Sequence, residues 1–187
     1  SVRIVRDCIT YCAENMKRYN PINISGYHIS EAGSSPLHEV AFTMCNLITY
    51  VEEVKKTGMH VDTFAPRLAF FFVCQADFFE EIAKFRAARR VYAKIMKERF
   101  GAQNPESMRL RFHCQTAAAT LTKPQYQINI VRTAIQALSA VLGGAQSLHT
   151  HGMAEGFRIP PEEAMEIALG KQPDPSLINI LRRRPAN

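Results

Sequence analysis

The sequence has no apolar stretch long enough to cross a lipid bilayer. Its longest uninterrupted apolar run, Leu68 to Cys74, is far shorter than the roughly 20 residues that a membrane-spanning helix requires. The first residues include Arg3, Arg6 and Asp7 and lack the pattern of a charged start, an apolar core and a small-residue cleavage site. The sequence therefore predicts neither a membrane partner nor a secretory signal.

Several motifs that would identify an enzyme class are also missing. The chain contains no Gly-x-Gly-x-x-Gly, no Walker phosphate loop and no Gly-x-Ser-x-Gly, so dinucleotide-binding, P-loop and α/β-hydrolase functions have no support. Its cysteines form no Cys-x-x-Cys pair, and an odd number of cysteines is typical of free thiols in a reducing compartment. We predict a cytoplasmic protein with five buried, reduced cysteines: Cys8, Cys12, Cys45, Cys74 and Cys114.

The composition is that of an ordinary globular domain. The 187 residues are 47% hydrophobic and 21% charged, and 23 basic against 17 acidic residues leave a net charge of +6. We interpret the excess as a solvated helix face rather than a nucleic-acid site, with a surface for an anionic ligand such as a phosphorylated cofactor as the weaker alternative. The basic residues concerned alternate with apolar ones: Arg86, Arg89, Arg90, Lys94, Lys97 and Arg99.

Long helical patterns alternate with short apolar runs along the chain, which is typical of βα units. Ser35 and Pro36 form a helix start, Asp77 can cap the next long helix, and Glu80 with Lys84 forms a favourable pair outside its apolar stripe. The predicted strands are 20–28, 68–73, 108–113 and 146–150, and the predicted helices are 2–16, 36–51, 78–95, 130–142 and 162–169.

The fold class predicted from this pattern is α/β, as a portion of a (β/α) TIM barrel with about four βα units and parallel strands. Eight strands are needed to close such a barrel, so residues 1–169 are expected to form half of one. Prolines 173, 175 and 185 disfavour further regular structure, and residues 170–187 are expected to be an atypical, poorly ordered tail.

Polar residues gather near the ends of the predicted strands. In a (β/α) barrel, ligands bind at the carboxyl ends of the strands. Arginine suits a phosphate there, and histidine or glutamine suits a carbonyl oxygen. We therefore predict one rim that binds an anionic or carbonyl-bearing ligand and gathers these residues: Tyr27, His28, Arg67, Arg111, His113, Gln115, Gln146, His149 and His151.

Each of these residues also has a purely structural interpretation. A histidine at a strand end is often hydrogen-bonded within the framework, Arg111 fits a solvated strand face, and Arg67 fits a helix cap. His149 and His151 share a strand face but lack a carboxylate or thiolate partner, so no metal site is predicted. Cys114 and the histidine before it point to opposite faces of a strand, which argues against a thiol nucleophile.

Five segments, in the same order along the chain, resemble the adenosylcobalamin-dependent acyl-CoA mutases, the family of methylmalonyl-CoA mutase. The resemblance covers about residues 2–169 and corresponds to the C-terminal half of the family's substrate-binding barrel. The matching segments are 24–33 (ISGYHISEAG), 67–71 (RLAFF), 77–89 (DFFEEIAKFRAAR), 111–116 (RFHCQT) and 141–150 (VLGGAQSLHT).

The resemblance implies an isomerase that uses adenosylcobalamin in a radical rearrangement of the carbon skeleton of an acyl-CoA. It implies that His28 bonds the thioester carbonyl and that Tyr27 packs near the corrin, and both are candidate catalytic residues. The implied acyl-CoA contacts are Arg18, Asn20, His28, Arg67, Leu68, Ala69, Arg111, Gln115, Gln146 and Ser147. The implied cofactor contacts are Tyr27, His113, His151 and Glu155.

The chain departs from the family pattern in several places. His151 stands where the family has asparagine, Ala69 stands where serine is usual, and residues 126–129 replace a Pro-Tyr-Asn-Asn-like segment. The cobalt-ligating Asp-x-His-x-x-Gly motif is not in the sequence. The implied partners are therefore a cobalamin-binding domain or subunit and a chain that completes the barrel, and the 187 residues alone are expected to be inactive.

Two further interpretations remain open at the level of sequence. The chain could be a non-catalytic subunit that uses the half-barrel as a scaffold and pairs with another chain. It could also be an acyl-CoA-binding protein that keeps Arg67, Arg111 and Gln146 but has lost the radical chemistry.

Overall fold

The computed structural model describes residues 2–155 and 162–171. Its centre is a parallel sheet of four strands in the order β1-β2-β3-β4. The α/β class with parallel strands is confirmed and is consistent with part of a (β/α) barrel. The strands are β1 (Asn23–Ser25), β2 (Ala69–Cys74), β3 (Phe112–Thr116) and β4 (Ser147–His149).

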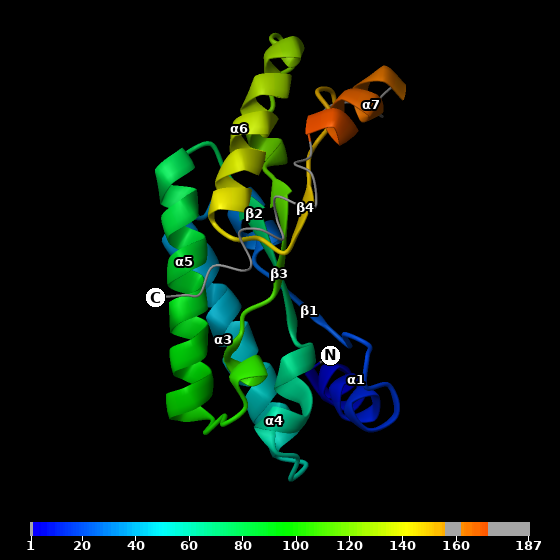
Figure 1. Ribbon diagram of the computed structural model, residues 1–187, viewed down its shortest axis with the longest axis vertical. Coiled ribbons are helices and arrows are strands. Elements are labelled where there is room, and N and C mark those ends of the chain that lie inside the picture. The colour runs from blue at the N-terminus through cyan, green and yellow to red at the C-terminus, as the bar shows by residue number, and fades with distance from the viewer. Residues whose placement is uncertain (1, 156–161, 172–187) are drawn as a thin grey trace.

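Three long helices cover one side of this sheet. Figure 1 shows α3, α5 and α6 along that side, with α1 and α4 near the amino ends of the strands. No helix within residues 2–155 and 162–171 is long and apolar enough to span a membrane. The helices are α1 (Val2–Asn15), α2 (Tyr27–Glu31), α3 (Pro36–Lys55), α4 (Val61–Phe64), α5 (Phe78–Lys94), α6 (Asn129–Leu142) and α7 (Glu162–Lys171).

The core lies between the sheet and these helices. Alternate residues of β2 and β3 point toward the helices, and the aromatic rings among them are at most 2% exposed. Phe85 of α5 stacks on Phe112 of β3 at 5.0 Å between ring centroids and meets Phe72 of β2 edge-on. Burial of these rings stabilises the sheet against its helical layer.

Two predicted strands have wrong boundaries. β1 ends at Ser25 and not near His28, because the backbone carbonyl of Gly26 accepts the N–H groups of Ile29 and Ser30 and opens α2. β3 begins at Phe112 and not at Met108, because Pro105–Met108 forms a 3₁₀ turn. The alternation of apolar and polar residues continues through the extended connection after that turn, which is why it resembled a strand.

Helix starts were predicted better than the contacts of helix side chains. Ser35 caps α3, with Pro36 at its first position, as expected. Asp77 precedes α5 as expected, but its side chain makes no capping hydrogen bond. The chain then continues from α5 into a short π-helix, Ile95–Arg99, and the 3₁₀ turn Ala65–Arg67 before β2 was not predicted.

Several side chains lie where the sequence did not place them. Lys84 does not form an outer pair with Glu80, because it is buried under the sheet. Arg89 is not on a fully solvated face, since it donates to the carbonyl of Gly143 at 2.6 Å. Cys8 and Cys45 are exposed, whereas the other three cysteines are buried as predicted. α7 runs to Lys171, and residues 172–187 of the predicted tail lie outside the described residues.

Candidate functional site

The face of the sheet opposite the helices carries mostly small and polar side chains, together with Phe71 and Val73 of β2. The strand register places Ser25, Phe71, His113 and Ser147 in one row across the four strands. His113 and Gln115 are only partly buried, whereas their neighbours in β3 are fully buried. Because a packed barrel interior is filled with bulky branched side chains, this face is suited instead to holding a ligand.

Tyr27 and Gln115 meet at the carboxyl end of the strands. Tyr27 is the first residue of α2, and its ring stacks on Phe71 of β2 at 4.7 Å with an angle of 8° between the ring planes. The side-chain nitrogen of Gln115 lies 3.4 Å from the Tyr27 hydroxyl. Burial raises the pKa of Tyr27 to about 12, with help from the negative charges of Glu31 and Glu155. The phenol is therefore protonated at neutral pH and can donate a hydrogen bond.

His151 joins this group from the loop after β4. Its Nε2 lies 3.0 Å from Gln115 Nε2, and its Nδ1 lies 2.9 Å from the hydroxyl of Thr116. Burial lowers the pKa of His151 and outweighs the nearby carboxylate of Glu155. The ring is thus neutral at neutral pH, with one nitrogen donating and the other accepting.

His113 is a second neutral imidazole on the open face. Its Nδ1 lies 2.8 Å from the hydroxyl of Ser147 on the neighbouring strand, and its ring contacts Phe71 at 5.2 Å between centroids. Burial and the neighbouring His149 lower the pKa of His113. The open face therefore offers uncharged hydrogen-bonding groups at two levels along the strands.

Glu155 adds one carboxylate to the carboxyl end. One of its oxygens accepts from the backbone N–H of Gly152 at 2.7 Å, and the other lies 3.7 Å from Nε2 of His149. Lys171 of α7 donates to the carbonyl of His151 at 3.0 Å and so fixes the same loop. The carboxylate can accept further hydrogen bonds, as from a pair of hydroxyl groups.

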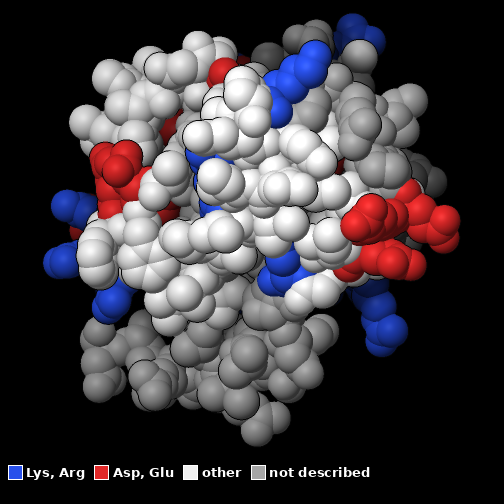
Figure 2. Space-filling view, turned by 90° about the horizontal axis from the view of Figure 1, so that it is seen from above, with Lys and Arg blue, Asp and Glu red and all other residues white. Residues whose placement is uncertain are grey.

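His28 is exposed and more loosely held than its neighbours. It is the second residue of α2, and its Nδ1 lies 3.3 Å from the hydroxyl of Ser25 at the end of β1. The other ring nitrogen of His28 has no hydrogen-bond partner among the described residues. Figure 2 views this end of the molecule and shows mostly uncharged side chains, with acidic groups gathered at two sides and basic groups at the edges and near the centre.

The expectation of a single rim is wrong for the predicted arginines. Arg67 lies in the 3₁₀ turn before β2, and Arg111 precedes β3. Arg18 and Asn20 likewise precede β1, and Gln146 precedes β4. These residues are at the amino end of the sheet, because each strand is short and starts after them. The site therefore has two ends, separated by the length of the strands.

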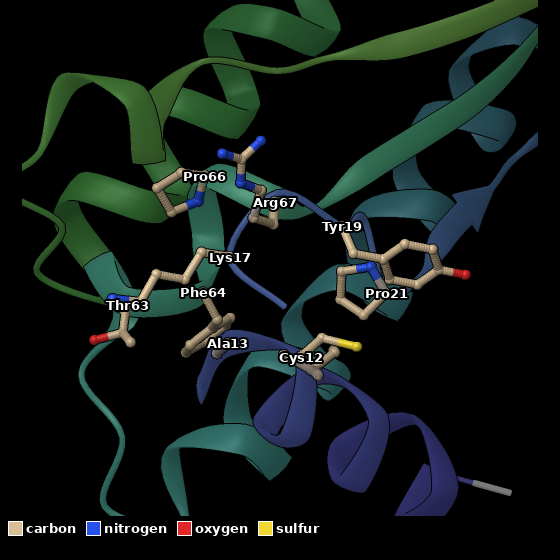
Figure 3. Close-up of a pocket in the computed structure, with 10 residues that line it drawn as sticks. Cys12, Ala13, Lys17, Tyr19, Pro21, Thr63, Phe64, Pro66 and Arg67 are labelled. Atoms are coloured by element: carbon tan, nitrogen blue, oxygen red, sulfur yellow. The ribbon is translucent and has the colours of Figure 1, made fainter. Parts of the chain in front are cut away.

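The amino end contains a cavity of about 230 Å³. It lies between α1 and the turn before β2, and Figure 3 shows Lys17, Tyr19 and Arg67 around it. Two cationic side chains thus line one hollow, which suits an anionic group. Lys17 was not among the predicted site residues, and its position three residues before Asn20 was the available signal.

The remaining predicted contacts at the amino end differ in how free their side chains are. Arg111 is paired with Glu106 at 2.8 Å. Both ends of the Gln146 amide are used, since it accepts from Phe112 N–H at 2.7 Å and donates to the carbonyl of Gly144 at 3.0 Å. Leu68 is buried, and Ala69 is partly exposed on the open face. Gln146 therefore holds the connection into β4 in place.

His149 lies at the carboxyl end, where it was predicted as a rim residue, although the family resemblance implied no specific contact for it. Its ring packs edge-on against His151 at 5.6 Å between centroids, and the register places it beside Gln115. Within residues 2–155 and 162–171, no group of three or more histidine, cysteine or acidic side chains could hold a metal ion.

The carboxyl end brings together an aromatic surface and uncharged hydrogen-bonding groups. Tyr27 on Phe71 supplies aromatic surface, and the neutral rings of His113 and His151 supply hydrogen-bonding groups without charge. Glu155 adds a carboxylate acceptor at the same end.

A parallel α/β sheet with helices on one face and polar side chains on the other is consistent with a piece of a (β/α) barrel. The family model for methylmalonyl-CoA mutase matches residues 1–173, and the chain therefore belongs to the methylmalonyl-CoA mutase family.

Similar proteins carry the same family name or a related one. The chain is 81% identical over 172 residues to the 2-hydroxyisobutanoyl-CoA mutase large subunit of Aquincola tertiaricarbonis, covering 92% of this chain and 31% of the relative. It is 44% identical to methylmalonyl-CoA mutase of Escherichia coli, covering 92% and 24%, and 42% identical to the mitochondrial enzyme of Homo sapiens, covering 92% and 23%. The chain thus spans less than a third of the length of these relatives.

Proposed function

We propose that this chain forms part of the substrate barrel of an adenosylcobalamin-dependent acyl-CoA mutase, an isomerase that rearranges the carbon skeleton of its substrate. The observation that carries the proposal is the separation of two kinds of group along the strands. Cations lie at the amino end, and neutral histidine, glutamine and tyrosine side chains lie at the carboxyl end. A long ligand with an anionic head and a thioester tail fits this polarity.

At the amino end, Lys17 and Arg67 bind the phosphates of coenzyme A. β2 has six residues and is about 20 Å long at the usual rise per residue, so the pantetheine arm can follow the open face toward the other end. The small side chains of Ser25, Ala69 and Ser147 leave room for that arm.

At the carboxyl end, His28 donates a hydrogen bond to the thioester carbonyl and orients the acyl group. Gln115 is anchored by Tyr27 and His151 and presents its amide to the same region. Adenosylcobalamin supplies the radical chemistry when it is bound. Tyr27, His113, His151 and Glu155 hold it, and the stacked Tyr27 and Phe71 rings help to exclude water.

The substrate class that we propose is a short branched 2-hydroxyacyl-CoA. The relative with 81% identity is named for 2-hydroxyisobutanoyl-CoA, and the family members at 42 to 44% identity are named for methylmalonyl-CoA. Because that relative is a large subunit, we also propose a partner subunit or domain that binds cobalamin, and further chain that completes the barrel.

The test uses a complete mutase in which this chain replaces the matching segment of the 81% identical relative. We expect His28→Ala to lower kcat about a hundredfold, the order for loss of one preorganised donor, with little change in KM. We expect Arg67→Ala to raise KM for the acyl-CoA about tenfold with kcat nearly unchanged, because phosphate binding is equal in ground and transition states.

Arg90→Ala is the matched control for the loss of an arginine, since Arg90 is exposed on α5. It should leave both constants unchanged. Full turnover by the His28→Ala enzyme would remove the role of His28, and a chimera that rearranges no acyl-CoA would contradict the proposed function itself.

A further inference from the structure

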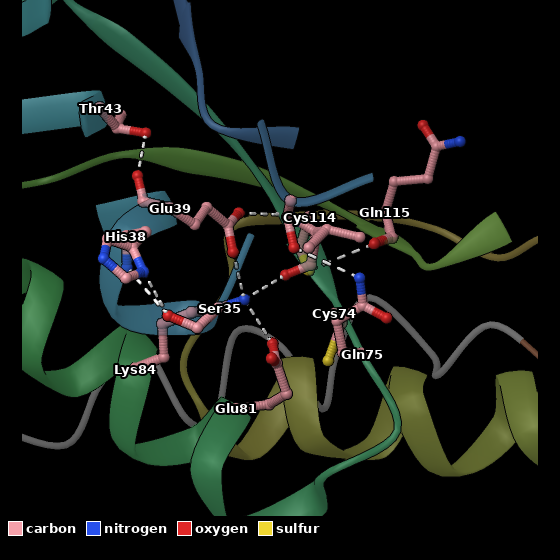
Figure 4. A network of polar contacts seen from close by, with 12 residues as sticks. Ser35, His38, Glu39, Thr43, Cys74, Gln75, Glu81, Lys84, Cys114 and Gln115 are labelled. Carbon is pink, nitrogen blue, oxygen red and sulfur yellow. Dashed lines mark hydrogen bonds and ion pairs between the residues drawn. The ribbon is translucent and has the colours of Figure 1, made fainter. Parts of the chain in front are cut away.

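Beside β2 lies a buried ionic cluster that takes no part in the proposed ligand contacts. Glu39 of α3 and Glu81 and Lys84 of α5 are its members, and their side chains are at most 2% exposed. Lys84 Nζ lies 2.8 Å from Glu39 Oε2 and also pairs with Glu81 (Figure 4). Burying charged side chains costs free energy unless each charge has a partner. The contacts of the cluster should therefore explain why it is buried at this position.

The cluster pairs with the part of β2 that extends beyond the end of β1. β1 ends at Ser25, and Gly26 makes the last backbone bond across to Phe71, while β2 continues to Cys74. The backbone of Val73 therefore has no strand partner on the β1 side. Glu39 Oε1 accepts from Val73 N–H at 3.0 Å, and Lys84 Nζ donates to the Val73 carbonyl at 2.8 Å. Both backbone groups are satisfied by this one ion pair, as buried backbone requires.

The same glutamate supports the turn from which the proposed catalytic residues project. A β-carbon on Gly26 would come within 2.9 Å of Glu39 Cγ and 2.4 Å of Thr43 Oγ1, so the Gly26 backbone rests directly on α3. Gly26 then opens α2, whose first two residues are Tyr27 and His28. A continuous set of contacts thus runs from Lys84 through Glu39 and Gly26 to His28.

We propose that Glu39 and Lys84 are positioning residues for Tyr27 and His28. Glu39 and Lys84 provide the hydrogen bonds to Val73 that a longer β1 would provide. The chain can therefore leave the sheet at Gly26, and α2 is held in a fixed position at the end of the open face. Neither side chain touches the ligand. This inference rests on the proposed function only for its kinetic consequence, because the hold on α2 is a property of the fold.

The experiment compares Glu39→Ala, Lys84→Met and Glu39→Gln in the chimeric complete mutase. Displacement of α2 by about 1 Å should lower kcat by roughly ten- to a hundredfold in the alanine and methionine variants, with KM for acyl-CoA little changed because the amino end is intact. Glu39→Gln keeps an acceptor for Val73 N–H, so it should retain most of kcat. If the two residues had only a structural role, the alanine and methionine variants would lose thermal stability but would not show a lower kcat at an unchanged KM. Glu39→Gln would then not preserve kcat.

Tyr92→Phe is the matched control. Tyr92 is buried on the same helix and donates to the carbonyl of Ser107 near the amino end, so its loss should weaken the fold without affecting α2. An unchanged kcat in folded Lys84→Met enzyme, or an equal loss of kcat in Tyr92→Phe, would overturn the proposal.

Amide hydrogen exchange gives a readout that does not depend on turnover. We expect the amides of residues 26–31 to exchange at least about tenfold faster in Glu39→Ala and Lys84→Met, and at the original rate in Tyr92→Phe. Unchanged protection of 26–31 in the first two variants would overturn the positioning role even if the chimera proves inactive. Faster exchange in an inactive chimera would support the positioning role and contradict only the proposed function.

Discussion

At the scale of single residues, Glu39 shows how strongly the fold can change a side chain's chemistry. Burial raises the pKa of Glu39 to about 7, although the positive charge of Lys84 and the N–H of Val73 oppose the change. Burial also raises the pKa of Glu81, whereas the two carboxylates hold the pKa of Lys84 above its usual value despite burial. Lys84 therefore stays charged near neutral pH, and a carboxyl group is the member of the cluster that titrates.

We predict that Glu39 makes β2 less stable as the pH rises from about 4.5 to 7. In that pH range Glu39 keeps a proton in the folded state that it has lost in the unfolded state. The free energy of unfolding therefore falls by up to about 3 kcal/mol between pH 4.5 and 7. Glu39→Gln should reduce this loss, and the part that remains belongs to Glu81, whose pKa is also raised by burial. The measurement is amide exchange of β2 in the complete mutase at several pH values, with each variant compared at equal pH.

Glu80→Gln is the control for that experiment, because Glu80 is exposed one residue before Glu81. Its pH profile should match that of the unmodified protein. Lys84 and Glu81 act on the titrating carboxyl of Glu39. The buried thiols of Cys74 and Cys114 lie near Glu81, and burial raises the thiol pKa of Cys114 well out of this range. A parallel pH dependence in the Glu39→Gln protein would contradict the assignment to Glu39.

At the scale of elements, the junction between β1 and α2 decides where the catalytic candidates lie. The strand has only three residues, and the five-residue helix after it crosses the end of β2. Gln75 reinforces the crossing by donating to the hydroxyl of Ser30 at 3.3 Å. The position of His28 thus depends on a short helix whose support comes from α3 and β2 rather than from its own length.

Gly26→Ala should destabilise this junction by about 1 to 3 kcal/mol, the usual cost of overpacking a tight site. The added methyl group would collide with Thr43 Oγ1, so Thr43→Ala in the same protein should recover part of the loss. The thermal midpoint of the complete mutase measures both effects.

Gly170→Ala is the comparison for Gly26→Ala, since a β-carbon at Gly170 meets no atom within 4 Å. It should leave the thermal midpoint unchanged or slightly higher, because alanine favours a helix. If Gly26→Ala is equally harmless, the close approach of Gly26 to α3 does not constrain the junction.

At the scale of the whole molecule, the described part of the sheet has two open edges. β1 pairs only with β2 and β4 only with β3, and the face opposite the helices is partly exposed. α6 packs against α5, α7 and the sheet, yet it leaves an apolar stripe that is 45 to 57% exposed: Val131, Ile135, Leu138 and Leu142. Unpaired edges and exposed apolar surface favour association with other chains.

We predict that the isolated 187-residue chain has no mutase activity and self-associates. Sedimentation and thermal melting, with and without adenosylcobalamin, acyl-CoA and a cobalamin-binding partner, provide the measurement. A broad distribution of sizes and a weak melting transition are expected for the chain alone. A sharp melting transition of a monomer that is indifferent to every addition would contradict this prediction.

Much of the fold could be predicted because it depends on short-range patterns. The spacing of apolar residues indicated the long helices, the run from Leu68 to Val73 indicated the central strand, and Ser35 with Pro36 marked the start of α3. Family motifs placed Tyr27, Gln115 and His151 among the candidate site residues, and the structure brings these three together. Their roles in binding and catalysis stay predictions.

The rest could not be predicted because it depends on where elements start relative to one another. A strand shifted by a few residues moves a side chain from one end of the sheet to the other, which is how Arg67 and Arg111 came to be expected beside His28. The helical period placed Lys84 on an outer face, since the pattern carries no information about Glu39, 45 residues away.

The sequence by itself determined the parallel α/β class, the order of its units and the family, because each is encoded in residues close along the chain. Only the tertiary structure decided that the site has two ends and that β1 stops at Ser25. It also decided that a buried ion pair makes the backbone hydrogen bonds to Val73 that a longer β1 would make. The physical reason is that unpaired backbone and buried charge must be satisfied within the folded interior, by whichever partners the packing of distant segments brings near.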